Sequence, residues 1–335
     1  MLIDRKSSRG FSLVELTVAS AAVGMLLLLA GPALNKGRAG VDVRRCQDNL
    51  RRLSRAHLMY AGVNGGFPPM AYAWPGVVPA RGRSTWYDDH GWYSLVGPYI
   101  GEPTWAAKLD FTVPIFRPEN LDARRSGLRL KLHACPSDVG LQRNEWDTVW
   151  ASVRSNYVAN AGNTNYGQTS IGGVAFLGAP FVGGLKTHLA SISDGLSYTL
   201  LMSEVVVFPE TAAWGGAYSA TQSAIGGQVF TGYNPPNSNI PDAIGRGRFG
   251  GLSQTDATLL YMQQGIPIPV AASTTDPRAT YIAPRSKHPG GVNAAMCNGA
   301  VGFVANAIDP AVWRALSTAQ GAGSGNPAEI NPSVP

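Results

Sequence analysis

SRGFSLVELTVASAAVGMLLLLAGPAL, residues 8–34, is the most informative stretch of the chain. No residue from Leu16 to Leu34 is charged, and this run of 19 residues is about the minimum for an α-helix that spans a bilayer. Lysine and arginine precede the run, so the positive-inside rule places the N-terminus in the cytoplasm. We therefore expect one membrane-inserted N-terminal helix and an extracytoplasmic remainder.

Three interpretations of this segment compete. A secretory signal peptide would end in a small-residue cleavage site, but the apolar run leads through Gly31-Pro32-Ala33-Leu34 without a convincing one. A plain signal anchor fits the apolar run but leaves Glu15 unexplained, because a carboxylate at membrane depth costs roughly 2–3 kcal/mol. The third interpretation starts from the residues around Glu15.

Gly10-Phe11 followed by Glu15 resembles the class III signal of type IV prepilins and type II secretion pseudopilins. The resemblance implies that a prepilin peptidase/methyltransferase cuts after Gly10 and methylates Phe11, the first mature residue. Glu15 would then stand at the fifth mature position, where pilins place a carboxylate that pairs with the terminal ammonium of a neighbouring pilin-like subunit. Pro32 matches the region where pilin helices commonly kink, because proline removes one helical hydrogen bond.

An amphipathic segment follows the apolar run. Its inward side chains recur every three or four residues, which predicts a helix that lays one stripe on a core: Val43, Cys46, Leu50, Leu53, His57 and Tyr60. Breakers from Asn64 onward end the pattern, so we expect a helix from Phe11 to about Gly62. Arginines occupy mostly the other face, and we expect them to be solvated near anionic membrane lipid. Nucleic acid is the less favoured partner, because no aromatic side chains interleave with them.

The composition of the remainder favours many short strands joined by loops. Only 14% of the 335 residues are charged, and the chain has 40 Gly and 24 Pro, a high share for a globular protein. The net charge is +6, with the basic excess in residues 1–10 and 36–55. Three cysteines permit at most one internal disulfide and match no zinc spacing, so we expect no metal and no other cofactor.

A series of short motifs follows the helix. They are CQDNLRRL from Cys46, CPSD from Cys135, SNYVANAG from Ser155, ISDGLSYTLLMSE ending at Glu204, and His288 followed by Asn298-Gly299 with nine residues intervening. In this order they resemble one bacterial family, the prepilin-type proteins with a C-terminal His-x9-Asp-Gly motif, catalogued as a domain of unknown function. Residues 70–130 and 205–285 match that family poorly. Asn298 replaces the family's aspartate, which puts in doubt a metal or proton role but suits a turn.

Two dipeptides in these motifs predict turns. Asn298-Gly299 lies between two β-type runs and predicts a two-residue hairpin loop in which both residues have positive φ. Asp194-Gly195 predicts a turn before a strand over residues 198–202. His288 is the best polar candidate for a further role. A lone histidine near a strand end is more often a hydrogen-bonded structural residue than a ligand.

The family resemblance also bears on the cysteines. Cys46 and Cys135 both lie in family-like motifs, and a disulfide that ties the helix to the domain is a hypothesis on that ground. The sequence itself leaves the pairing open. Cys297, beside the hairpin turn, is expected to be a small buried residue.

No catalytic motif is evident. The chain has no G-x-S-x-G elbow, H-E-x-x-H pair, Walker loop or EF-hand spacing, and we expect no enzyme activity. The one tight acid and histidine group is Asp88-Asp89-His90, flanked by Trp86, Tyr87, Trp92 and Tyr93. It could line a sugar-binding groove, although a capped loop on a hydrophobic patch is the more common structure.

We therefore expect an α+β, pilin-like fold, in which a long N-terminal helix packs on an antiparallel sheet with β-rich insertions. The expected parts are a cleaved leader (1–10), a transmembrane and assembly helix (11–34), its amphipathic continuation (35–62), a β-rich domain (63–320) and a flexible tail (321–335). The expected function is a pilin or pseudopilin subunit in the bacterial cytoplasmic membrane or in a filament or secretion machine. The alternative is a membrane-tethered protein that binds a glycan or surface polymer through the aromatic region.

Overall fold

The computed structural model describes most of the chain after the predicted leader. It covers residues 12–72, 90–113, 115, 117–127, 130–138, 155–207, 229–244, 254–271 and 279–321. Within its helices and strands it describes the backbone alone for residues 22–24, 26–39, 71–72, 254–257, 260 and 271.

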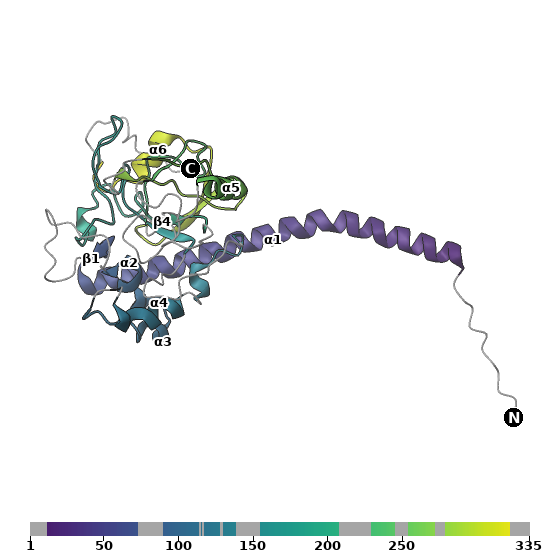
Figure 1. The fold of residues 1–335 in the computed structure, drawn as a ribbon, viewed down its shortest axis with the longest axis horizontal. Coiled ribbons are helices and arrows are strands. Elements are labelled where there is room, and N and C mark those ends of the chain that lie inside the picture. Colours follow the sequence, from purple (N-terminus) through teal and green to yellow (C-terminus); the bar gives the residue numbers. More distant parts are fainter. Residues whose placement is uncertain are drawn as a thin grey trace, which may run out of the picture.

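One long helix, α1 (Leu13–Asn64), dominates the shape and projects from the globular part as a rod (Figure 1). It begins with a capping box: the Ser12 hydroxyl accepts from the Glu15 N–H, and the Glu15 carboxylate accepts from the Ser12 N–H. It ends at Gly65, whose φ of 79° is the left-handed conformation that glycine adopts at helix ends. The helix therefore continues slightly beyond the expected end near Gly62.

The predicted transmembrane segment, residues 11–34, falls partly outside the described residues. Phe11 is not described, and neither are most side chains between Ala22 and Leu34. Where side chains are described, no helix has both the length and the hydropathy that crossing a bilayer requires.

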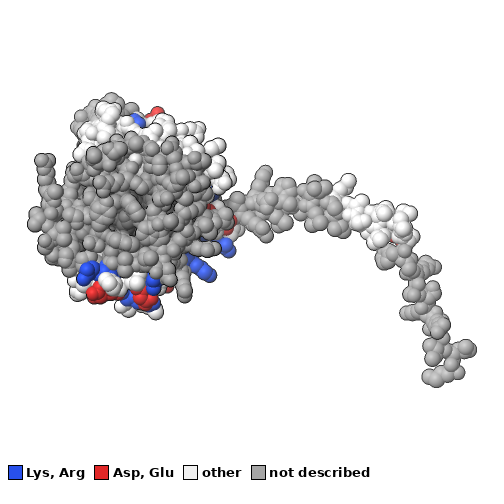
Figure 2. Space-filling model, in the orientation of Figure 1, with Lys and Arg blue, Asp and Glu red and all other residues white. Residues whose placement is uncertain are grey.

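The second half of α1 buries the stripe that its spacing predicts. Cys46, Leu50, Leu53 and His57 are fully buried and Tyr60 is nearly so, whereas Val43, the first member of the predicted stripe, is only half-buried. The arginines between residues 44 and 55 lie on the other face and are exposed or half-exposed. Figure 2 shows Lys and Arg where α1 leaves the globular part. It also shows charges of both signs together at the domain's lower edge.

The structure is α+β, and its main sheet has five strands in the order β5-β3-β4-β8-β9. These strands are β3 (Tyr157–Asn160), β4 (Leu200–Glu204), β5 (Val229–Phe230), β8 (Gly291–Met296) and β9 (Val301–Ala305). Three pairs are antiparallel, but β5 runs parallel to β3, so the sheet is mixed and the purely antiparallel expectation is wrong. A parallel pair needs a long crossover, and the chain between β3 and β5 is long enough to supply one.

Shorter elements surround this sheet. The strands are β1 (Ala71–Tyr72), β2 (His90–Gly91), β6 (Ala243–Ile244) and β7 (Val270–Ala271). The helices are α2 (Trp92–Leu95), α3 (Pro103–Ala106), α4 (Leu121–Gly127), α5 (Gln254–Gln264) and α6 (Pro310–Leu316). Short 3-10 helices are η2 (Gly97–Tyr99), η3 (Pro118–Asn120), η4 (Lys131–His133) and η5 (Leu189–Ser191).

Two groups of buried residues fill the interior. Leu50 and Leu53 of α1 belong to the same buried cluster as Leu201 of β4 and Ala295 of β8. A second, smaller cluster contains Trp313 of α6 together with side chains from the same strands. Leu200 and Leu201 are neighbours in β4 and belong to different clusters, because successive side chains of a strand point to opposite faces.

The hairpin between β8 and β9 forms where Asn298-Gly299 predicts it, but with a different turn. Gly299 has a φ of 88°, whereas Asn298 is absent from the non-glycine residues with positive φ in the described chain. The Gly299 N–H donates to the Met296 carbonyl, and the Met296 N–H donates to the Ala300 carbonyl. The loop is thus a hairpin turn with a β-bulge, in which Gly299 alone has the left-handed conformation, rather than a two-residue loop with two left-handed residues.

The Asp194-Gly195 dipeptide also forms a turn. Gly195 has a φ of 95°, and its N–H donates to the Ile192 carbonyl. The following strand begins at Leu200 rather than Tyr198 and extends through Glu204. This shift matters for the site, because it makes Glu204 the last residue of a central strand.

Candidate functional site

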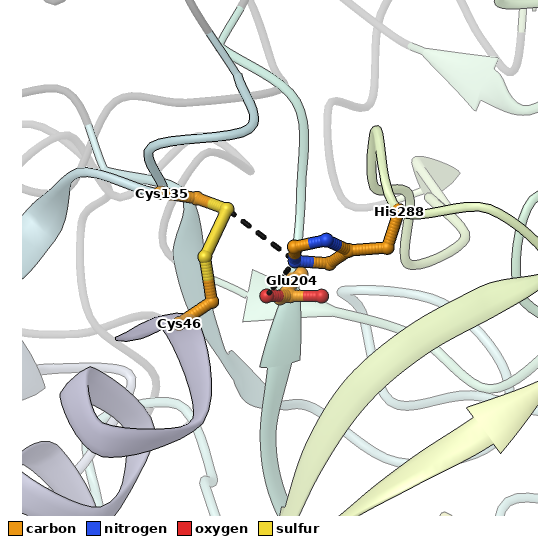
Figure 3. Close-up of side chains that lie close together, drawn as sticks. All are labelled: Cys46, Cys135, Glu204 and His288. Carbon is orange, nitrogen blue, oxygen red and sulfur yellow. Dashed lines mark hydrogen bonds and ion pairs between the residues drawn. A yellow bond between two sulfur atoms is a disulfide. The ribbon is translucent and has the colours of Figure 1, made fainter. Parts of the chain in front are cut away.

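Four side chains from distant parts of the chain meet in the interior (Figure 3). Cys46 comes from α1, Cys135 follows η4, Glu204 ends β4, and His288 precedes β8. Each is at most 4% exposed. One ligand-type atom from each lies within 4.8 Å of those of the other three. The sequence places the four residues in separate motifs, and only the fold brings them together.

The two cysteines form a disulfide. Cys46 and Cys135 are 89 residues apart, and their Cα atoms are 5.3 Å apart. The Cys135 N–H donates to the Asn156 side-chain oxygen at 2.8 Å, which fixes this loop beside the start of β3. Cys297 is a free, buried thiol, and burial raises its pKa well above the ordinary value.

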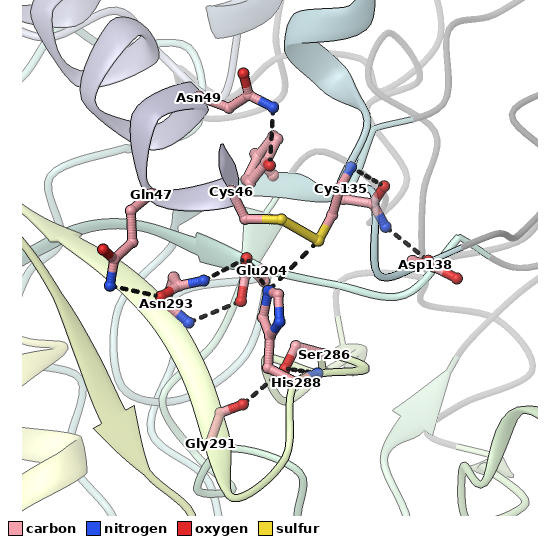
Figure 4. A network of polar contacts seen from close by, with 12 residues as sticks. Cys46, Gln47, Asn49, Cys135, Asp138, Glu204, Ser286, His288, Gly291 and Asn293 are labelled. Carbon is pink, nitrogen blue, oxygen red and sulfur yellow. Dashed lines mark hydrogen bonds and ion pairs between the residues drawn. A yellow bond between two sulfur atoms is a disulfide. The ribbon is translucent and has the colours of Figure 1, made fainter. Parts of the chain in front are cut away.

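His288 lies between the disulfide and the carboxylate. Its Nε2 atom is 3.4 Å from Cys135 Sγ and 3.3 Å from Glu204 Oε1. Its backbone N–H donates to the hydroxyl of Ser286, and that hydroxyl donates to the carbonyl of Gly291 at the start of β8 (Figure 4). The imidazole is therefore aimed at the cluster by a short loop that is itself tied to the sheet.

Glu204 is a buried carboxylate whose oxygens are held by the neighbouring strand. Oε2 accepts the Asn293 backbone N–H at 2.7 Å, and Oε1 accepts the Asn293 side-chain NH₂ at 3.0 Å. The Asn293 side-chain oxygen in turn accepts from Gln47 of α1 at 3.1 Å. A buried charge is tolerated when it is paired and hydrogen-bonded, and this one links β4, β8 and α1 in one polar chain.

A second polar chain lies on the Cys135 side of the cluster (Figure 4). The carboxylate of Asp138 accepts from the Asn156 NH₂ at 2.7 Å and from the Val207 N–H at 2.6 Å. Asn49 of α1 donates to the Tyr157 hydroxyl at 3.2 Å. Burial, with a smaller contribution from the Glu204 charge, raises the pKa of Tyr157 far above its usual value. Tyr157 is therefore a neutral hydrogen-bonding residue.

The other motif residues gather at the opposite end of β8. The Asn298 side-chain NH₂ donates to the Ser197 hydroxyl, and the Asn298 N–H donates to the Leu196 carbonyl. The Gly299 turn thus lies against the Asp194-Gly195 turn, and Asp194 accepts from the Thr318 hydroxyl at 2.7 Å. The two ends of the His-x9-Asn-Gly motif therefore lie in different places. His288 belongs to the buried cluster, whereas Asn298 and Gly299 form one of two turns that contact each other.

The predicted N-terminal site residues lie at or beyond the edge of the described chain. Gly10 and Phe11 are outside it, and Pro32 is described only by its helical backbone. Glu15 is exposed in the first turn of α1.

The aromatic group considered for sugar binding is only partly described. Trp86, Tyr87, Asp88 and Asp89 lie outside the described residues. His90 is 3% exposed, with its ring nitrogens within hydrogen-bond distance of the Ser94 hydroxyl and the Val113 carbonyl. Trp92 and Tyr93 are buried in the core. The described members of this group therefore belong to the interior.

Sequence reasoning missed the convergence of Cys46, Cys135, Glu204 and His288. Their separations along the chain carry no metal-type spacing, because they come from a helix, a loop, a strand end and a second loop. The one feature of the sequence that could have indicated this convergence is that each of the four residues belongs to a motif that resembles the family.

Comparison with known proteins adds one finding. Residues 44–311 match the family described as "Protein of unknown function (DUF1559)", a span that contains all four cluster residues. No curated protein and no solved structure matches the chain.

Proposed function

The chain belongs to this DUF1559 family, and from that premise we propose that it is a pilin-like structural subunit. In this proposal the first half of α1 inserts into the bacterial cytoplasmic membrane or the core of a filament, and the globular domain lies outside the cytoplasm. The observation that carries it is the bare apolar surface at the start of that half, where Leu13, Val14, Leu16 and Val18 are between 64% and 80% exposed.

An apolar helix surface of this size is unfavourable in water. Burial of apolar area contributes about 25 cal/mol per Å², and fully burying one large aliphatic side chain contributes about 1.5–3 kcal/mol. In the described part of the chain nothing covers these residues, because α1 projects away from the domain (Figure 1). Lipid or the corresponding helix of another subunit is the environment that would stabilise them.

Glu15 adds a reason to favour other subunits over lipid alone. Its carboxylate accepts the Ser12 N–H at 2.8 Å, at the helix end where the backbone dipole favours negative charge. The apolar neighbours on either side would take this charge into a low-dielectric environment. There it needs a cation, and the terminal ammonium of a processed neighbouring subunit would supply one.

The globular end of α1 fits the same role. The helix is fastened to the domain by the Cys46–Cys135 disulfide and by the bond from Gln47 to Asn293. A load applied along α1 would therefore reach the globular domain through a covalent link at Cys135 as well as through side-chain packing. The expected pilin-like arrangement, a long helix seated on a sheet, belongs to this proposal.

Leader removal is the first test. The change Gly10→Ser is expected to block cleavage, so that the protein isolated from membranes keeps the mass of residues 1–335. Intact-mass measurement of the purified protein would show a mature chain beginning at methylated Phe11 in the parent. Gly40→Ser is the matched control, since a Cβ at exposed Gly40 of α1 meets no atom within 4 Å. A parent that keeps residues 1–10, or a Gly10→Ser variant that loses them, would contradict the proposal.

Assembly is the second test. Glu15→Gln keeps a side chain that can complete the capping box but removes the charge, whereas Glu15→Ala removes both. Both variants are expected to be cleaved normally and to lose about tenfold or more of subunit association, the equivalent of 1.4 kcal/mol. Cross-linking of two differently tagged copies in membranes measures this, with Glu102→Ala as the control for an exposed carboxylate on the domain. Parent-like cross-linking of Glu15→Gln would rule out charge pairing.

A further inference from the structure

The buried cluster has the dimensions of a metal centre. Zinc bonds of about 2.0–2.3 Å in tetrahedral geometry place neighbouring ligand atoms roughly 3.3–3.8 Å apart. His288 Nε2 lies 3.4 Å from Cys135 Sγ and 3.3 Å from Glu204 Oε1, so two edges of such a tetrahedron are already formed. Of the other four edges, the one between the two bonded sulfur atoms must open, and the other three join ligand atoms that lie within 4.8 Å of one another.

The donor set also suits one class of ion. Two thiolates, one imidazole and one carboxylate form a mixed sulfur, nitrogen and oxygen set of the kind that binds Zn²⁺. We propose that, when the Cys46–Cys135 disulfide is reduced, these four side chains bind a single tetrahedral Zn²⁺-class ion. The same cluster would then have two states, a disulfide without metal and a dithiolate with metal.

Conversion between the states balances with a dithiol reductant. The reductant gives two electrons and two protons and becomes a disulfide, while the Cys46–Cys135 bond breaks and each sulfur takes one proton. Binding of the ion releases those two protons, because the thiolate is the ligand form. The disulfide form retains only His288 and Glu204 as ligands and is expected to bind the ion far more weakly.

The surroundings of the cluster already orient the ligands. Both carboxylate oxygens of Glu204 are held by Asn293, and the backbone at Cys135 is held by Asn156. Such outer contacts fix ligand orientation in metal sites. Burial of all four side chains matches a closed structural site, from which water is excluded.

Charge gives a further reason for an ion in the reduced state. Reduction alone gives two thiols, and the loss of their protons without an ion would place two thiolates beside the Glu204 carboxylate in an interior where each group is at most 4% exposed. Like charges this close in a low-dielectric site are strongly unfavourable. A divalent cation among them removes most of that repulsion.

The test is metal uptake by the full chain in detergent, reduced with a dithiol under anaerobic conditions and then freed of reductant. Co²⁺ is the probe, because its visible spectrum reports tetrahedral geometry and its near-ultraviolet charge-transfer band reports thiolate ligands. One Co²⁺ per reduced chain, displaced by Zn²⁺, and none on the oxidised chain is the expected result. Circular dichroism of the same samples shows whether the domain is folded.

Variants separate this site from adventitious binding. Cys46→Ser and His288→Ala are expected to lose the charge-transfer band or the tetrahedral spectrum, whereas Cys297→Ala, which changes the free buried thiol, keeps both. The proposal is overturned if the reduced chain takes up no Co²⁺, if it unfolds with Co²⁺ present, or if Cys46→Ser keeps the parent spectrum. Because purified protein suffices, this outcome is independent of leader processing and assembly.

Discussion

Replacing Cys46 and Cys135 together by alanine is expected to lower the free energy of unfolding by about 4–5 kcal/mol. The disulfide joins residues 89 positions apart, so its removal frees a long loop in the unfolded chain. Loop-closure entropy predicts a stabilisation of this size for a loop of roughly 100 residues. The effect is large because total stabilities are only about 5–15 kcal/mol.

Urea unfolding of the full chain in detergent, followed by tryptophan fluorescence, measures this change. The midpoint should fall in the double variant and in the parent after reduction, while Cys297→Ala should shift it far less, since that thiol closes no loop. A decrease below about 1 kcal/mol would show that the disulfide contributes little beyond the packing around it. Partial recovery of the reduced parent on adding Zn²⁺ would agree with the metal-bound state proposed above.

The buried face of α1 and two of the turns illustrate what the sequence predicts well. The stripe from Cys46 to Tyr60 predicts a helix face that is buried, because a period near 3.6 residues has one structural outcome. Glycines of Asp-Gly and Asn-Gly pairs predict turns, because positive φ is sterically costly for other residues. These are local rules, and they succeed where local geometry decides the structure.

What the sequence did not predict depends on tertiary context. The direction of β5 beside β3 is decided by how a distant segment returns to the sheet, and no residue in either strand encodes it. Likewise, the residues around Glu204 contain no pattern that predicts its contact with His288, which is 84 positions away. Asn298 does not have the predicted left-handed conformation, because in this turn only Gly299 needs a positive φ.

His57 is a buried histidine on the same stripe of α1. It is fully buried between the rings of Trp92 and Phe181, each with a centroid distance of 5.3 Å. Its Nδ1 atom is 2.8 Å from the carbonyl oxygen of Leu53, and its Nε2 atom has no hydrogen-bond partner among the described residues. Burial lowers the pKa of His57 to about 4, and the bond to Leu53 opposes this shift only in part.

This pKa predicts that acid destabilises the protein through His57. Below its ordinary pKa of 6.5 the unfolded state binds a proton that the folded state excludes, so unfolding becomes easier as pH falls towards about 4. The expected loss is about 1.4 kcal/mol per pH unit, or about 3 kcal/mol across the window. His57→Asn keeps a donor for the Leu53 carbonyl but cannot titrate. The free energy of unfolding, measured with urea from pH 7 to pH 4, should therefore fall less steeply with pH in the variant than in the parent, by about 1.4 kcal/mol per pH unit. Equal pH dependence in the two proteins would mean that His57 gains its proton without opening the core.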